Sequence, residues 1–292
     1  MKQRYIIFCL MLIFLEGCKY KRTYDNGIVF KECHKELYSI GNDTYNFEKI
    51  FPNTTYNVLY DQLIGKIWVH RVIDENSIFQ FIEEDGSLSR EIIISYENVI
   101  PVLGGKCFIN NNVAFISASG DLKFICINLN EQTYSIITLN SNDFLYKPIT
   151  GFSGDFIFTD DLCYEIKQST KHFFPINLSY TSYMAKIDRI IGITNDGNIV
   201  LLNYKNGTYE TLPVKRILKK NKFQYVPECL YYADENYIYY SRYSKCYPSY
   251  LYFTFGLDTF EPIKWFRYNK KNGDCKLLNS PSEHSLIMGV KK

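Results

Sequence analysis

The sequence predicts an all-β protein, a β-propeller of about six four-stranded blades, although five or seven blades would also fit. Strand-like runs recur from residue 27 to residue 292 with turn signals between them, and almost no segment has a sustained helical period. The strand-turn unit repeats at a step of about 40 residues, which is typical of a propeller blade. The composition agrees, because Tyr, Phe and Ile favour strands whereas Asn, Asp and Gly favour turns.

Hairpin turns mark the repeat. Three are clear, at Asp85-Gly86, Asn206-Gly207 and Asn272-Gly273, because each has an apolar strand, a second turn residue suited to positive φ and a shorter return strand. Two weaker copies turn near Glu131-Gln132 and Gln168-Ser169. The markers Gly86, Gln132, Ser169, Gly207 and Gly273 are separated by 46, 37, 38 and 66 residues. The first three steps match one blade each.

A further strand precedes most of the hairpins. These strands are expected in residues 65–72, 112–121, 154–161, 189–198 and 236–244. The long last step is interpreted as an insertion at 214–228 with one helical turn, and residues 27–60 provide strands for one more blade. A strand from the N-terminal region is expected to complete the blade that ends near Leu277 or Leu278, since closure removes open sheet edges. A large β-sandwich or two smaller β domains are the alternatives.

The N-terminus has the layout of a secretion signal. Lys2 and Arg4 precede an uncharged run at 5–15, which at about 1.5 Å per residue is too short to cross a bilayer core. The end of this run, Leu15, Gly17 and Cys18, resembles the bacterial lipobox, although Glu16 departs from its pattern. The resemblance implies cleavage between Gly17 and Cys18 and lipidation of Cys18. A plain secreted protein and a signal anchor remain the alternatives.

These features divide the chain into a signal peptide at 1–17, a lipidated cysteine with its tether at 18–26, and a propeller domain at 27–292. Lipobox and blade periodicity together resemble the six-bladed propeller lipoproteins of Bacteroidetes-type bacteria. The resemblance implies a cell-envelope protein held to a membrane by lipid. No acidic run follows Cys18, which favours the periplasmic side of the outer membrane.

Composition and residue spacing exclude several classes of function. The formal net charge of +2 predicts no nucleic-acid binding. The four histidines, His34, His70, His172 and His284, lack metal-ligand spacing, and no cofactor or metal is expected. Seven cysteines remain after the signal peptide and Cys18, an odd number. Buried thiols are favoured over bridges such as Cys107 with Cys126 or Cys229 with Cys246.

No catalytic residues can be selected from the sequence. Carboxylate groups on expected loops occur at Asp160-Asp161, Glu83–Asp85 and Asp234-Glu235, but nothing singles out a pair. The tyrosine-rich segment 231–252 is the candidate binding surface, with Tyr239, Tyr240, Tyr243, Tyr247 and Tyr250, against packing between blades as the alternative. The sequence favours a lipid-anchored binding or scaffold module for an envelope protein or glycan. The alternative is a propeller enzyme, a glycan or lactone hydrolase or lyase, with its site in the central funnel.

Overall fold

The computed structural model describes most of the chain from residue 28 onward. The described residues are 28–32, 37–40, 43–103, 105–120, 122–139, 149–195, 197–212, 225–244, 264–278 and 285–290. The predicted signal peptide and tether lie outside these ranges.

The described strands form six four-stranded antiparallel sheets. Five of them each consist of four consecutive strands. In chain order they are β4 (Tyr56–Asp61), β5 (Lys66–Ile73), β6 (Asn76–Phe81) and β7 (Ile92–Ile94); β8 (Cys107–Asn110), β9 (Val113–Ser117), β10 (Lys123–Asn128) and β11 (Thr133–Thr138); β12 (Gly151–Phe152), β13 (Phe156–Phe158), β14 (Leu162–Glu165) and β15 (Thr170–Phe173); β16 (Tyr180–Met184), β17 (Arg189–Ile193), β18 (Ile199–Leu202) and β19 (Tyr209–Leu212); and β20 (Tyr225–Ala233), β21 (Tyr237–Ser244), β22 (Lys264–Asn269) and β23 (Cys275–Leu278).

The remaining sheet joins the two ends of the chain. It places β24 (Ser285–Val290) beside β1 (Ile28–Glu32), followed by β2 (Leu37–Ile40) and β3 (Asp43–Asn46). The expected closure by an N-terminal strand in the blade ending near Leu278 is therefore wrong, because β20–β23 already supply four strands there. The C-terminal strand β24 instead pairs with β1 and is the fourth strand of the N-terminal sheet. This pairing covers the edge of β1 that would otherwise be open.

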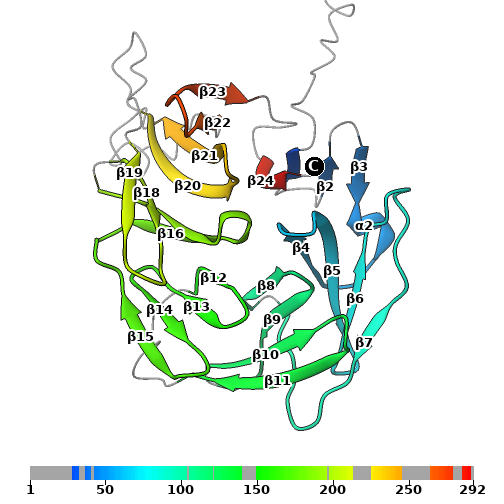
Figure 1. Cartoon of the computed structure of the whole chain (residues 1–292). Helices are drawn as coiled ribbons and strands as arrows, with labels where there is room; N and C mark the ends of the chain where they lie inside the picture. The colour runs from blue at the N-terminus through cyan, green and yellow to red at the C-terminus, as the bar shows by residue number, and fades with distance from the viewer. Residues whose placement is uncertain are drawn as a thin grey trace, which may run out of the picture.

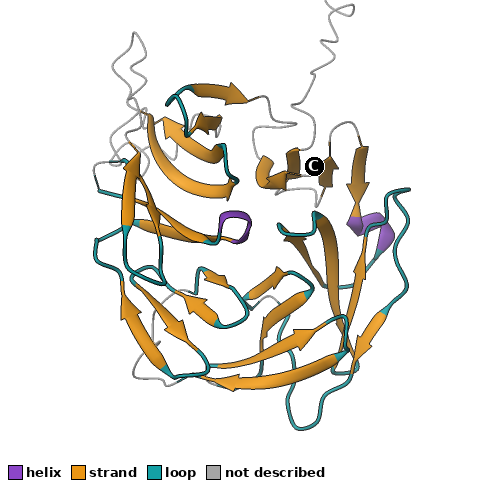
Figure 2. Cartoon of the chain, viewed as in Figure 1, coloured by secondary structure: helices purple, strands orange, loops and turns teal. Residues whose placement is uncertain are grey.

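The sheets surround a common axis, as in a β-propeller (Figure 1). Among the first strands of the sheets, β8 contacts β4 and β12, β16 contacts β12 and β20, and β20 contacts β24. These strands therefore line the centre, and the fourth strands β7, β11, β15, β19 and β23 lie at the periphery. The fold class predicted from the sequence is confirmed. The described helical elements are short, α2 (Phe47–Ile50) and the 3-10 turn η1 (Ala185–Ile187), which lies near the axis (Figure 2).

The repeat markers all fall between the third and fourth strands of their sheets. Gly86, Gln132, Ser169, Gly207 and Gly273 have φ values of 84°, 54°, 53°, 71° and 73°. A hairpin turn that matches the twist of its strands requires this left-handed conformation, which explains why the markers keep one phase. The strands expected before the hairpins are also present, but as the second strand of each sheet.

The first strands β8, β12, β16 and β20 were not predicted from the sequence. β12 has two residues, Gly151 and Phe152, too few to carry a strand pattern. Part of the expected insertion is also strand, since β20 begins at Tyr225, and residues 214–224 lie outside the described ranges.

The core is divided among the interfaces between neighbouring sheets. Phe115 of β9 stacks on Phe152 of β12 at 4.5 Å between ring centroids, and Phe158 of β13 stacks on Tyr183 of β16 at 4.6 Å. Four hydrophobic clusters of the described residues likewise combine residues of adjacent sheets. The aromatic content of the sequence thus fills the wedges between blades, where large planar side chains bury the most surface.

The cysteines in the described part of the chain are free thiols. They are Cys107, Cys126, Cys163 and Cys275, so the bridge between Cys107 and Cys126 is absent and the thiol alternative holds for this pair. Cys163 is buried, as expected for a small apolar side chain. The pair Cys229 and Cys246 cannot be compared, because the Cys229 side chain and all of Cys246 lie outside the described residues.

Candidate functional site

The tyrosines proposed as a binding surface divide into two groups. Tyr239 and Tyr240 are 4% and 0% exposed, and Tyr240 stacks on Phe266 at 5.6 Å. These two side chains belong to the packing between strands, which corrects their assignment to an exposed surface. The Tyr243 side chain, Tyr247 and Tyr250 lie outside the described residues, as do Gly17 and Cys18.

Of the two described histidines, His70 is buried and His172 is exposed. His70 is 0% exposed, stacks on Phe79 at 4.6 Å and has its Nε2 at 2.9 Å from Ser77 Oγ. Burial lowers the pKa of His70 to about 4, so the ring is neutral at physiological pH. His172 lies on the outer strand β15 and is exposed. His34 and His284 lie outside the described residues.

The three carboxylate groups on loops are not brought together. Glu83–Asp85 lie between β6 and β7, Asp160-Asp161 between β13 and β14, and Asp234-Glu235 between β20 and β21. They therefore belong to three different sheets. In an antiparallel sheet successive connections alternate between the two ends, so Asp160-Asp161 also lie on the opposite face of the propeller from the other two groups. Glu235 alone among these acids lines the groove described next.

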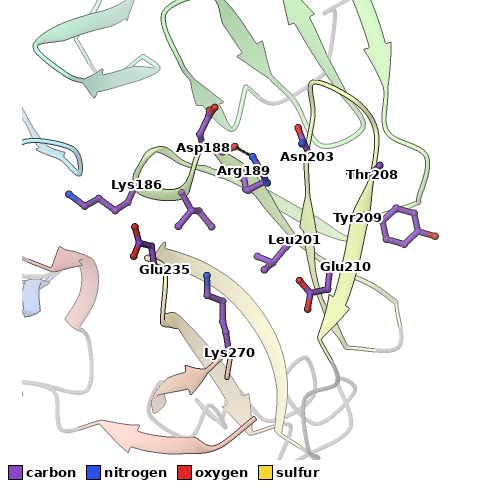
Figure 3. Close-up of a pocket in the computed structure, with 11 residues that line it drawn as sticks. Lys186, Asp188, Arg189, Leu201, Asn203, Thr208, Tyr209, Glu210, Glu235 and Lys270 are labelled. Atoms are coloured by element: carbon purple, nitrogen blue, oxygen red, sulfur yellow. Dashed lines mark hydrogen bonds between the residues drawn. The ribbon is translucent and has the colours of Figure 1, made fainter. Parts of the chain in front are cut away.

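A groove of about 690 Å³ lies between the sheets β16–β19 and β20–β23. One wall comes from η1, the start of β17 and the β18–β19 hairpin. The other wall comes from the β20–β21 and β22–β23 turns, as Figure 3 shows. The described lining residues are Lys186, Ile187, Asp188, Arg189, Leu201, Asn203, Thr208, Tyr209, Glu210, Glu235 and Lys270. Six of these eleven are charged, three of each sign, so the groove is a polar site.

Asp188 is the structural centre of one groove wall. Its carboxylate accepts hydrogen bonds from Tyr183 Oη at 3.0 Å, Tyr204 Oη at 2.7 Å and Lys205 Nζ at 2.7 Å. Its φ is 49°, a left-handed conformation that Asp and Asn tolerate better than most residues. Burial alone would raise the pKa of Asp188, but the three hydrogen bonds to the charged form lower it below its usual range.

The facing wall carries Lys270 and Glu235. Lys270 N donates to Asn236 O at 2.9 Å, which holds the β22–β23 turn against the β20–β21 turn. Partial burial lowers the pKa of Lys270, and the neighbouring carboxylates of Asp234, Glu210 and Glu235 raise it by a smaller amount. Within the described ranges, Lys270, Glu235 and Glu210 form no ion pair within 4.0 Å. These charges of both signs therefore face the groove without a direct ion pair among the three.

Most of the groove residues were not singled out by sequence reasoning. The sequence around Lys186, Asp188 and Arg189 has no motif that sets it apart from a strand and its turn. The left-handed residue there is Asp188 rather than a glycine, so it gives no turn signal. The described residues contain no group of three or more His, Cys, Asp or Glu side chains placed to hold a metal ion. No helix among them is long and apolar enough to cross a membrane.

Comparison with known proteins adds a similarity of fold. No family model and no curated protein sequence matches this chain. Among solved structures, it is similar to the WD40 domain of Neurospora crassa Pan2, with 13% identity, a TM-score of 0.38, and coverage of 77% of this chain and 66% of that one.

Two more of these structures are PorZ and the nidogen/laminin complex. PorZ, a bacterial surface component of the type-IX secretion system of Porphyromonas gingivalis, has 10% identity and a TM-score of 0.41, covering 90% of this chain and 39% of that one. A chain of the nidogen/laminin complex has 8% identity and a TM-score of 0.45, covering 90% and 99%. The match thus spans less than two thirds of the Pan2 and PorZ chains. Similarity at this level says nothing of what this protein binds, and the propeller assignment rests on its own strand order.

Proposed function

We propose that this protein is a binding module, held to the bacterial cell envelope by lipid on Cys18, and that the groove receives a segment of a protein partner. The observation that carries the proposal is the presence of unpaired charges of both signs on facing walls of one groove. Such charges select a partner by electrostatic complementarity and speed its association. The acidic side chain of such a segment would pair with Lys270, and its basic side chain would pair with Glu235 on the same wall or with Glu210 on the facing wall.

The alternative, a glycan or lactone hydrolase or lyase, finds no support in the three groups of loop acids that the sequence offered. A glycosidase needs two carboxyl groups about 5 to 10 Å apart across the scissile bond. Glu83–Asp85, Asp160-Asp161 and Asp234-Glu235 lie in separate sheets. None of these groups supplies a partner for another, so we do not propose an enzymatic reaction.

The anchor is tested by intact mass and membrane partitioning. The full chain is expressed in a lipoprotein-processing bacterium beside a Cys18→Ala variant. A diacyl- or triacyl-sized mass increment on a chain that begins at Cys18, lost in the variant, is the expected result. An unmodified chain in both preparations would contradict the lipid anchor and leave the groove proposal to its own test.

The groove is tested by charge reversal. Lys270→Glu and Glu235→Lys are compared with matched reversals at exposed positions outside the groove, Lys123→Glu and Glu131→Lys. Envelope proteins cross-linked to each variant are quantified by mass spectrometry, after circular dichroism has established that each variant is folded. We expect partners that both control variants retain and both groove variants lose, with retention weakened by salt. Equal retention by the groove and control variants would refute the groove as the binding site.

A further inference from the structure

The outer strand β11 is the open edge of its sheet. In the strand order β11-β10-β9-β8 it stands at one end, and among the described residues it pairs with β10 alone. Figure 1 shows it at the periphery of the propeller. An edge strand presents a row of backbone N–H and C=O groups that can pair with a further strand. This edge can therefore accept one more strand from outside the sheet.

β11 differs in length and charge from the other fourth strands, β7, β15, β19 and β23. Its sequence over Thr133–Thr138, TYSIIT, is six residues long and contains no charged side chain, proline or glycine. β7 has only three residues, and β15, β19 and β23 have four residues each with one charge, at Lys171, Glu210 and Lys276. Short strands and edge charges are the usual means by which proteins keep a sheet edge from pairing. β11 has neither.

The pairing with β10 determines which backbone groups of β11 face outward. Leu139 N donates to Leu122 O at 3.0 Å, which directs the backbone of Leu139 toward β10. Because this direction alternates along a strand, Tyr134, Ile136 and Thr138 turn their N–H and C=O groups to the open edge. The Ile136 side chain is 47% exposed beside these groups. The edge thus combines free backbone positions with an exposed apolar side chain.

The edge is already formed in the single chain. All six residues of β11 pair in register with residues of β10. Tyr134 is held further, because its ring packs edge-on against Tyr96 at 5.0 Å and its Oη accepts a hydrogen bond from Glu97 N at 2.9 Å. Addition of a strand to such a pre-formed edge loses little conformational entropy in this protein.

We infer that β11 pairs with β11 of a second copy of this protein, antiparallel across a two-fold axis at Ile136. In this register Ile136 lies opposite its own copy and Tyr134 lies opposite the partner's Thr138, so every outward-facing residue enters a hydrogen-bonded pair. An aromatic side chain opposite a β-branched one is a stabilising combination, the two exposed isoleucines cover each other, and no like charges meet. A two-fold pairing occupies both edges, so it closes at a dimer.

The length of β11 sets the strength of this dimer. Six residues at about 3.4 Å each give a paired edge of about 20 Å. Stable interfaces bury about 1,600 Å², and smaller ones belong to weak complexes, so we expect a dissociation constant of about 10–100 μM. The dimer does not depend on the proposed groove function, because the groove lies between two other sheets, β16–β19 and β20–β23.

The dimer is tested by sedimentation equilibrium of the Cys18→Ser chain with a reductant present, at about 1–200 μM. Ile136→Lys places like charges opposite each other across the axis. Leu277→Lys is the matched control, because Leu277 is likewise exposed, at 55%, on a fourth strand. An equimolar mixture of Ile136→Lys and Ile136→Glu chains then places opposite charges at the same position. Circular dichroism establishes that each variant is folded.

We expect a concentration-dependent dimer that Ile136→Lys weakens about five- to tenfold, that Leu277→Lys leaves unchanged, and that the mixture restores. Three outcomes would overturn the inference: a monomer at every concentration, as for an edge covered by the chain itself or by a different protein; equal dissociation constants for Ile136→Lys and Leu277→Lys; or a mixture no more dimeric than its components. Lys270→Glu separates the two proposals, because it should lose the groove partner and keep the dimer.

Discussion

The buried histidine makes a specific prediction about how stability depends on pH. His70 is held between Phe79, Ser77 and Cys107 with no exposed surface, and its pKa is lowered to about 4 from about 6.5 in an unfolded chain. The unfolded state therefore binds more protons than the folded state between these two values. Stability is complete above the unfolded pKa and is lost as pH falls toward the folded pKa. The total loss is about 3 kcal/mol, of which about 2 kcal/mol falls between pH 7 and pH 5.

The assay is urea unfolding over this pH range for the Cys18→Ser chain and for two further variants in that background. His70→Gln removes the titrating ring but keeps a polar group beside Ser77. Between pH 7 and pH 5 the unfolding free energy of this variant should therefore fall by about 2 kcal/mol less than that of the parent chain. His172→Gln, at an exposed histidine, should keep the original pH dependence. Because both carry the same carboxylates, their difference isolates His70. Equal pH dependence in His70→Gln and the parent chain would refute the neutral, buried state.

Three further predictions concern the fold. Gly151→Ala should destabilise the protein by about 1–3 kcal/mol in chemical unfolding, because its Cβ would meet Tyr183 Cβ; Gly192→Ala should cost less, because the first obstacle is the movable end of Leu178. Asp188→Asn, which suits the left-handed backbone equally well, should lower the unfolding free energy by about 1 kcal/mol through the lost charge, and no change would argue against its hydrogen-bond network. Removal of β24 should abolish cooperative unfolding followed by circular dichroism, since it leaves β1 paired with β2 on one side only and opens the ring; a cooperative monomer would contradict the role of ring closure.

Much of the fold could be predicted because the repeat is determined by residues in local turns. Each of the five hairpin markers needs only a residue that tolerates positive φ between two strands, and at Gly86, Gly207 and Gly273 that residue is a glycine. Gln132 and Ser169 occupy the same conformation without glycine, and they were identified as weaker hairpins from the strand patterns on either side of them. Strand pairs joined by such turns are local, so their existence does not depend on distant parts of the chain.

The closure and the first strands could not be predicted in the same way. β24 pairs with β1 across almost the whole length of the chain, and no local pattern specifies which end supplies the closing strand. β12 is defined by two residues that pair with β13 and lie against β8 and β16, so its identity comes from neighbours rather than from its own sequence. The assignment of Tyr239 and Tyr240 to an exposed surface failed partly for this reason, because the alternation along β21 does not say that both side chains are covered.

The residues of the candidate sites are the hardest to predict from the sequence, because these sites lie between strands and turns of different sheets. Ala185 lines a cavity of about 270 Å³ between the first strands β4, β8, β12 and β16, whereas Lys186 lines the groove, so η1 separates the two. Tyr183 lines the same cavity, and its Oη donates to Asp188 on the groove wall, which joins the two through one hydrogen bond. A short turn with a left-handed aspartate carries no recognisable motif, yet it shapes both surfaces. In a propeller, binding residues of this kind follow from the ring geometry, which sets neighbouring turns side by side, and they become visible only when the blades are assembled.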